Sequence, residues 1–263
     1  MNIMELIRTR KSVRTFDGKQ ISSNEIQQLS DYCRTITNPY EIPVNFILLD
    51  AEKYGLSSPV ITGEHLYIAA KVPKTKHCEE AFGYAFEKMV LYAWSMGIGT
   101  TWIGGTMKRE NFEKAIQLNE TEIMPCVSPL GYPAKKRSVK EIGMRTAIRA
   151  DKRMPDKELF FENNFSTSLN VPDKNVLNAL EAVRLAPSAV NRQPWRIVKQ
   201  GTVYHFYEYR SLDRNSGSKW DVQKVDMGIA LYHFITLTNG RLHISNPDIE
   251  TPKDTEYIAS ILL

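Results

Sequence analysis

Apolar positions recur at helical spacing in two long stretches of the chain. Between Glu79 and Met96 the apolar residues follow one another three or four positions apart and form a wide stripe, which is typical of a central, buried helix. Gly97 ends this stretch, as glycine commonly does just past a helix. A second apolar stretch begins near Asp221 and ends at Asn239-Gly240. The pattern therefore predicts one long buried helix in each half of the chain.

Shorter helices are indicated by their capping residues. Ser22 and Glu25 form a capping box, in which the hydroxyl and the carboxylate satisfy amides that the first helical turn leaves without partners. Asp173 is suited to cap a later helix. The expected shorter helices run from this capping box to about Arg34, over 109–118 and over 174–185.

Strands are predicted where β-branched and aromatic residues cluster between turn residues. Gln200-Gly201 separates two such runs and predicts a hairpin. The expected strands lie at 44–49, 127–130, from Trp195 to the hairpin turn, 204–209, 242–244 and 257–262.

The two halves repeat the order helix, strand, long helix, glycine stop and strand. Pro43 precedes the strand of one half and Pro194 that of the other, while Gly83 and Gly228 stand near the starts of the two long helices. A diverged internal duplication explains this order. Two α+β stretches could also look alike by chance, so pattern alone leaves both explanations open.

Composition fits a folded globular protein. The chain has 263 residues, 42% hydrophobic and 24% charged, enough for one large domain or two small ones. Its apolar runs are far shorter than the ~20 residues of a membrane span, and its start shows no signal-peptide pattern. Three cysteines at wide spacings suggest reduced thiols and a cytoplasmic location. His77-Cys78 has no second Cys/His cluster, so no metal site is expected.

Positive charge is concentrated in one stretch. The net charge is +4, and between Lys135 and Arg153 eight Lys or Arg residues face only Glu141 and Asp151. Such a stretch can bind nucleic acid. No aromatic residue interleaves these charges for base stacking, which favours a solvated face or a seat for one phosphate group.

The first candidate site runs from Arg8 to Phe16. Four cations and the Ser12 hydroxyl fall within seven residues, just past a short predicted helix. Arginine forks form strong charge-assisted bonds to phosphate. This segment could hold a phosphate dianion, or it could be only a solvated helix end.

The second candidate is the loop from Ala186 to Trp195. Its prolines stiffen the backbone, and Ser188, Asn191 and Gln193 could hydrogen-bond the edge of a planar heterocycle. The alternative is a tight connection with a buried tryptophan.

The third candidate is the glycine-rich segment from Gly97 to Gly105. It follows a helix and has Trp102 where a third glycine would fall, so it is not a dinucleotide fingerprint. Its far glycines would let a ligand approach backbone amides. A simple helix-to-strand turn would look the same.

Together these segments resemble the nitroreductase family of FMN flavoproteins over most of the chain. Arg10, Ser12 and Arg14 match the family's Arg-x-Ser-x-Arg/Lys phosphate motif. Ala186 to Trp195 matches its Ala-Pro-Ser-x-x-Asn-x-Gln-Pro-Trp loop without exception, and Gly97 to Gly104 matches its Gly-x-Gly-Thr-x-Trp-x-Gly segment.

The order of the motifs departs from the family. The loop normally follows the phosphate motif closely, but Ile36 to Glu41 occupies that place here without matching it. Family homodimers build each FMN site from both subunits. The resemblance therefore implies a fused single-chain variant of the thermophile type, an α+β nitroreductase-like fold packed as an intramolecular pseudo-dimer. Its two diverged halves, 1–164 and 165–263, would each have a mostly antiparallel sheet flanked by helices.

The resemblance also implies one complete FMN site per chain, at the interface between the halves, and one decayed site. A backbone amide of Gly104 or Gly105 would face flavin N5. The residues implied to bind FMN are Arg10, Lys11, Ser12, Arg14, Arg153, Pro187, Ser188, Asn191 and Gln193.

The implied function is an FMN-dependent oxidoreductase. It would pass electrons from NADH or NADPH to nitroaromatics, quinones or similar small acceptors by a ping-pong mechanism. The alternatives are a flavin-binding or storage protein with little turnover, a flavin reductive dehalogenase, and a structural protein in which both sites have decayed. Neither nucleic acid nor membrane is expected as a partner, and the fused unit could be a monomer or assemble further.

Overall fold

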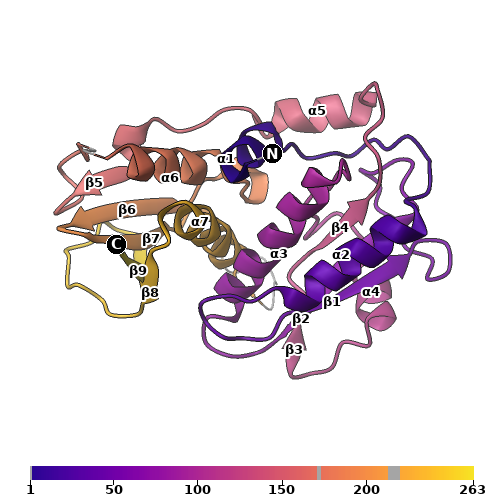
Figure 1. The fold of residues 1–263 in the computed structure, drawn as a ribbon, viewed down its shortest axis with the longest axis horizontal. Coiled ribbons are helices and arrows are strands. Elements are labelled where there is room, and N and C mark those ends of the chain that lie inside the picture. Colours follow the sequence, from indigo (N-terminus) through magenta and orange to yellow (C-terminus); the bar gives the residue numbers. More distant parts are fainter. Residues whose placement is uncertain (1, 171–172, 213–219) are drawn as a thin grey trace.

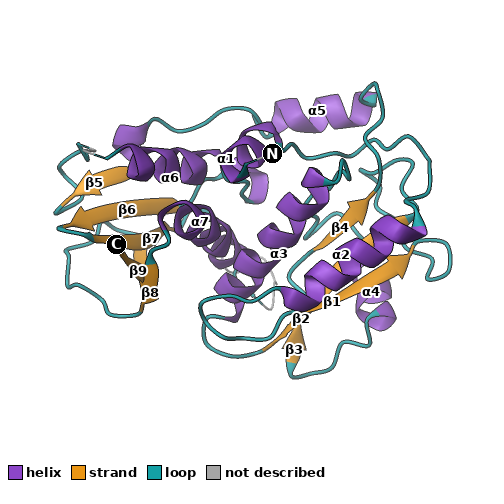
Figure 2. Ribbon diagram, in the orientation of Figure 1, coloured by secondary structure: helices purple, strands orange, loops and turns teal. Residues whose placement is uncertain are grey.

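Two sheets stand at opposite ends of the molecule with helices between them (Figure 1). The computed structural model describes residues 2–170, 173–212 and 220–263. Figure 2 shows the strands of each sheet grouped together and the long helices α3 (Cys78–Ser95) and α7 (Val222–Thr238) in the middle. The arrangement is the expected α+β pseudo-dimer.

The first sheet is built around β2 (Leu66–Pro73). This strand pairs antiparallel with β1 (Asn45–Asp50), β3 (Glu122–Ile123) and β4 (Val127–Leu130). Because side chains alternate along a strand, its two faces carry separate cores. Ile68, Ala70 and Val72 pack with residues of α2 (Ser23–Thr35) and α3. Tyr67 and Ala69 pack with residues of α4 (Arg109–Ala115).

The second sheet has the strand order β5-β6-β7-β9-β8. Only β5 and β6 are parallel, and the remaining pairs are antiparallel. Helix α6 (Lys174–Leu185) and α7 supply its core. The five strands are β5 (Phe160–Glu162), β6 (Trp195–Gln200), β7 (Val203–Tyr209), β8 (Arg241–His243) and β9 (Thr255–Leu262).

Two segments of the predicted first half, residues 1–164, pack with elements of the second half. Helix α1 (Ile3–Thr9) buries Met4, Leu6 and Ile7 in the core of α6 and α7. Strand β5 pairs with β6 although it precedes residue 164. The division at 164/165 stays a prediction, and these contacts show that segments cross between the halves.

The helix within the basic stretch was not predicted. Helix α5 covers Val139–Ala147, and the Ser138 hydroxyl caps it by accepting from the amide of Glu141. Two short 3₁₀ helices follow, η1 (Asp156–Glu158) and η2 (Ala189–Asn191). Figure 1 places α5 beside α1 at the edge shared by the two halves.

The predicted elements agree closely with the observed ones. The strand at 127–130 and the helix at 174–185 have the predicted bounds. The predicted helix at 109–118 ends at Ala115, and Gln117 has a left-handed φ of 53° that does not continue a helix. Strand β2 was missed because its apolar residues face both ways and show no alternation.

Candidate functional site

The first and third sequence motifs lie side by side. Ser12 forms a parallel bridge with Thr100, and the Val13 amide donates to the Thr100 carbonyl at 2.8 Å. A Cβ on Gly99 would lie 2.8 Å from a methyl carbon of Val13, so glycine permits this close approach. The glycine segment therefore supports the backbone of the phosphate motif.

Arg10 is buried at the interface between the long helices. Its side chain is 6% exposed, and its Nε lies 3.9 Å from Oε1 of Glu87, whose side chain is fully buried. Burial lowers the pKa of Arg10, and the charge of Glu87 opposes that shift. His233 of α7 completes the network, with Nε2 3.1 Å from the same Glu87 oxygen. The arginine is thus fixed by both halves.

Arg14 is also buried and lies under α5. Its backbone amide donates to Oε2 of Glu141 at 3.3 Å, and the Thr15 hydroxyl donates to the same oxygen at 2.9 Å. Burial lowers the pKa of the Arg14 guanidinium, while Glu141 opposes the shift. These bonds fasten α5 onto the phosphate motif.

The loop from Ala186 to Trp195, the second sequence motif, contacts Arg153 close to Arg10. Nη1 of Arg153 donates to Oδ1 of Asn191 at 3.2 Å. Burial lowers the pKa of Arg153, and the nearby positive charge of Arg10 lowers it further. Cations from residues 10 and 153 and a loop at residue 191 therefore share one neighbourhood.

The amides of the loop hold the backbone around Arg153. Asn191 Nδ2 donates to the carbonyls of Arg149 (2.8 Å) and Lys152 (2.9 Å). Gln193 Oε1 accepts from the Met154 amide at 2.8 Å, and Gln193 itself is only 4% exposed. These contacts give both amides a positioning role that sequence reasoning did not foresee. Their predicted contacts with flavin remain predictions.

The loop is held in a strained backbone conformation. Val190, Asn191 and Gln193 have positive φ values of 44°, 59° and 52°. A β-branched residue at positive φ is uncommon and persists only where its surroundings enforce it. Both carboxylate oxygens of Asp226 accept from the Ala189 amide at 3.0 Å, and the Ser188 hydroxyl accepts from the Gln193 amide at 2.9 Å. Strain of this kind is common at ligand-binding sites.

Buried guanidinium nitrogens remain without partners at this site. Among the described residues, nothing accepts a hydrogen bond from Nε and Nη1 of Arg10, Nη1 of Arg14 or Nε of Arg153. Buried polar atoms are normally paired, and buried cations need a compensating charge. Three such groups fit a phosphate dianion.

Open space lies beside the glycine segment. A Cβ on Gly105 would meet no atom within 4 Å, and one on Gly104 only the Pro125 carbonyl oxygen at 3.7 Å. The Thr100 and Thr101 hydroxyls are buried and have no hydrogen-bond partner in the described part of the chain. The backbone at Gly105 is therefore open to a ligand, and the roles predicted for Gly104 and Gly105 stay predictions.

Three further predicted site residues differ in their exposure. Ser12 and Pro187 are half-buried, and Lys11 is exposed. Sequence reasoning missed Glu87 and Asp226, whose signal was a carboxylate inside an apolar helical stretch. His233 is buried, and its Nδ1 lies 2.7 Å from the Ala182 carbonyl oxygen, so this histidine packs between α6 and α7.

The described residues contain no group of three or more His, Cys, Asp or Glu side chains arranged to hold a metal ion. None of the helices described has the length and apolar character needed to cross a membrane.

Comparison with known proteins finds similar nitroreductases. A putative nitroreductase from Thermotoga maritima matches the structure with a TM-score of 0.65 and 22% identity, covering 100% of this chain and 94% of that chain. A nitroreductase family protein from Clostridium difficile matches at a TM-score of 0.47 and 16% identity, over 60% of this chain and 96% of that chain. A nitroreductase with bound FMN from Desulfitobacterium hafniense matches at 0.44 and 17%, over 52% of this chain and 92% of that one.

The TM-scores of the last two matches are too low to establish a shared fold. No curated protein matches the chain significantly. The family described as "Putative TM nitroreductase" matches residues 2–237. With the motifs, the fold and this match in agreement, the chain belongs to that nitroreductase family.

Proposed function

We propose that the chain is an FMN-dependent oxidoreductase that passes electrons from NADH or NADPH to small acceptors such as nitroaromatics and quinones. Family membership supports the oxidoreductase class. The observation that supports FMN as the cofactor is the set of unpartnered, buried guanidinium nitrogens on Arg10, Arg14 and Arg153. A phosphate dianion would supply the missing acceptors and the missing negative charge.

The chain's own residues fall into three roles in this proposal. Arg10, Arg14 and Arg153 neutralise the phosphate, with Ser12 and Lys11 beside them. Asn191 and Gln193 position Arg153 and rigidify the loop whose Pro187 and Ser188 border the ring. A backbone amide of Gly104 or Gly105 donates to the ring at the place where electrons arrive, because fixed donors stabilise developing charge.

FMN, when bound, supplies a redox-active ring that accepts a hydride from a reduced nicotinamide and returns electrons to an acceptor. The protein leaves the space beside Gly105 open. Donor and acceptor would use this opening in turn, which gives a ping-pong scheme. The hydride transfer itself requires no side-chain acid or base.

The proposed stoichiometry is one FMN per chain. The place in the first half that corresponds to the loop is occupied by Ile36 to Glu41, where Tyr40 stacks on His77 with ring centroids 5.2 Å apart. No Arg-x-Ser-x-Arg sequence precedes the loop in the second half. The second site would therefore lack both its polar loop and its cations.

Binding and reduction of flavin test the proposal. Protein reconstituted with FMN should hold one flavin per chain and lose its yellow colour when NADPH or NADH is added without oxygen. Arg10→Ala and Asn191→Ala should each weaken FMN binding about 10- to 100-fold, the equivalent of one or two charge-assisted hydrogen bonds.

Matched controls are Arg34→Ala and Asn111→Ala. Arg34 is an exposed arginine that pairs with Asp31, and Asn111 donates to the Gly55 carbonyl elsewhere in the first half. Both variants should bind FMN normally. Colour that persists with both dinucleotides would favour a flavin-storage protein, and failure to bind FMN would remove the proposal.

A further inference from the structure

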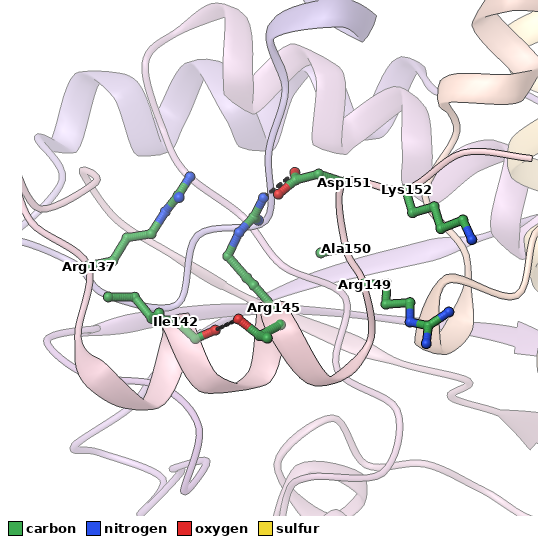
Figure 3. Close-up of a pocket in the computed structure, with 8 residues that line it drawn as sticks. Arg137, Ile142, Arg145, Arg149, Ala150, Asp151 and Lys152 are labelled. Atoms are coloured by element: carbon green, nitrogen blue, oxygen red, sulfur yellow. Dashed lines mark hydrogen bonds and ion pairs between the residues drawn. The ribbon is translucent and has the colours of Figure 1, made fainter.

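A second basic site lies next to the proposed phosphate site. A cavity of about 310 Å³ opens between α5 and the segment after it, at the lower end of the ~300–1,000 Å³ range of ligand pockets. Its lining residues are Arg137, Ile142, Arg145, Thr146, Arg149, Ala150, Asp151 and Lys152. Figure 3 shows Arg137 and Arg145 extending to the same side of α5, with Arg145 meeting Asp151.

Two of the four cations of this cavity have carboxylate partners. Arg145 pairs with Asp151, and Nε of Arg137 lies 3.3 Å from Oε1 of Glu141. Within the described ranges, no carboxylate pairs with Arg149 or Lys152. The cavity therefore keeps two positive charges that the protein does not neutralise.

The second half of the chain holds these two residues in place. Asn191 Nδ2 donates to the carbonyls of both Arg149 and Lys152. Arg149 also has a left-handed φ of 49°, so the backbone at this point is constrained. The loop that positions Arg153 toward the buried phosphate site thus also positions the exposed cations of the cavity.

The side chains of the two sites differ in burial. A buried site is suited to a ligand that stays bound, and an exposed site is suited to a ligand that exchanges. The Arg10 side chain is 6% exposed and Arg14 is buried, whereas Arg149 and Lys152 are exposed. Exposed charges are screened by water and salt and bind weakly. Weak, open cation sites attract an anion that arrives and leaves in each turnover, and they raise its local concentration.

The chemistry of the proposed reaction identifies the anion. Nitroaromatic and quinone acceptors carry no phosphate, and the FMN phosphate is accounted for by the buried arginines. No aromatic side chain lines the cavity to stack nucleic-acid bases. We propose that Arg149 and Lys152 bind a phosphate of the nicotinamide dinucleotide co-substrate. This inference rests on the proposed function, because the dinucleotide is the electron donor of that reaction.

The test uses FMN-loaded protein and ligands that do not turn over. Oxidised NADP and oxidised NAD are titrated calorimetrically into wild type, into Arg149→Gln/Lys152→Gln and into the control Lys135→Gln/Lys136→Gln. The control removes the same charge from the same basic stretch, from residues that do not line the cavity.

The cavity variant should bind dinucleotide about tenfold more weakly, with a shallower dependence on salt. The control variant should bind as wild type does. If only NADP binds more weakly, the cavity holds the extra ribose phosphate of NADP. If NADP and NAD are weakened equally, it holds the pyrophosphate. Both outcomes support the site.

The inference is overturned if the cavity variant binds both dinucleotides normally. It is also overturned if FMN affinity, measured by flavin fluorescence, falls as much as dinucleotide affinity, since the cavity would then hold the FMN phosphate. Failure of NADPH or NADH to reduce the flavin would instead count against the proposed function, because the titration does not depend on reduction.

Discussion

Gly83 and Gly228 lie where α3 crosses α7, and at each position the backbone of the other helix leaves no room for a side chain. A Cβ on Gly83 would lie 2.0 Å from the Val225 carbonyl oxygen, and one on Gly228 would lie 2.0 Å from the Glu80 carbonyl oxygen. In both cases the carbonyl belongs to the residue three positions before the other glycine. Such reciprocity is characteristic of a two-fold interface. The crossing thus supports descent of both halves from one dimeric unit.

The first prediction concerns this crossing. Gly228→Ala should lower the free energy of unfolding by at least about 1–3 kcal/mol, because a backbone carbonyl cannot move aside as a flexible side chain could. Urea unfolding of the flavin-free protein measures the change. Gly143→Ala is the matched control, since Gly143 lies in exposed α5 with no atom within 4 Å of its added Cβ. It should stabilise the protein by roughly 0.5–1 kcal/mol, and equal losses in both variants would contradict the prediction.

Local signals in the sequence were sufficient for most elements and for the motifs. Capping at Ser22 and Asp173 and the apolar stripe of α3 each depend on neighbouring residues, so they can be read without tertiary information. Ser138 and Glu141 also follow the Ser-x-x-Glu pattern, so α5 could have been predicted from its cap. Gly83 and Gly228 also stand at matching positions near the starts of the two long helices. This correspondence is visible in the sequence alone and suggested the duplication.

Long-range contacts could not be predicted in the same way. The use of Asn191 and Gln193 to hold the backbone around Arg153 depends on segments about forty residues apart. The packing of α1 in the second core depends on the topology of the whole chain. No periodicity in the sequence encodes such contacts.

The second prediction concerns the buried pair of Arg10 and Glu87. Glu87→Gln should destabilise flavin-free protein by about 3–5 kcal/mol, because it leaves the Arg10 cation buried without its carboxylate. The gain in melting temperature on adding FMN should then exceed that of wild type, since phosphate would replace the lost charge. Thermal melts with and without FMN measure both effects.

The double variant Arg10→Met/Glu87→Gln is the control for this pair. It should recover much of the lost stability, because residue 10 no longer carries a buried charge that lacks its carboxylate, and it should lose most of the FMN-induced gain. If Glu87→Gln alone shows no larger response to FMN than wild type, then Arg10 does not face the phosphate.

The third prediction concerns the thiols. Burial raises the pKa of Cys33 to about 12, and burial together with Glu79 raises the pKa of Cys78 to about 12. Burial also raises the pKa of Cys126 well above its usual range. Because the thiolate is the reactive form, all three thiols should react with a disulfide reagent at about pH 8 on the order of a thousandfold more slowly than in urea.

An exposed cysteine provides the reference for that experiment. Ser245 is exposed and lies outside the proposed site, so Ser245→Cys should add one fast-reacting thiol to the native protein. A native wild-type protein that reacts as fast as this variant would contradict the burial of its cysteines.

The last prediction concerns Asp226, which supports the strained loop. Burial raises the pKa of Asp226 well above its usual range, and the hydrogen bond from Ala189 opposes only part of that shift. The unfolded carboxyl has an ordinary pKa of about 3.9, so it loses its proton first as the pH rises. The folded state then binds more protons than the unfolded state, and stability must fall as pH rises through the raised pKa.

Asp226→Asn removes this dependence while keeping an oxygen that can accept from the Ala189 amide. The variant's free energy of unfolding should rise relative to that of wild type as the pH is raised from about 5 to about 8. The difference should reach on the order of 1–3 kcal/mol, which is the cost of an incompletely paired buried group. Urea unfolding at several pH values measures this difference. Asp248→Asn is the matched control, because it makes the same change at an exposed aspartate with positive φ, which asparagine also tolerates, and it should not reproduce the gain of Asp226→Asn. A benefit of Asp226→Asn that shrinks as the pH rises would mean that the buried carboxyl is stabilised in its charged form, and that the loop at Ala189 is held by a paired carboxylate.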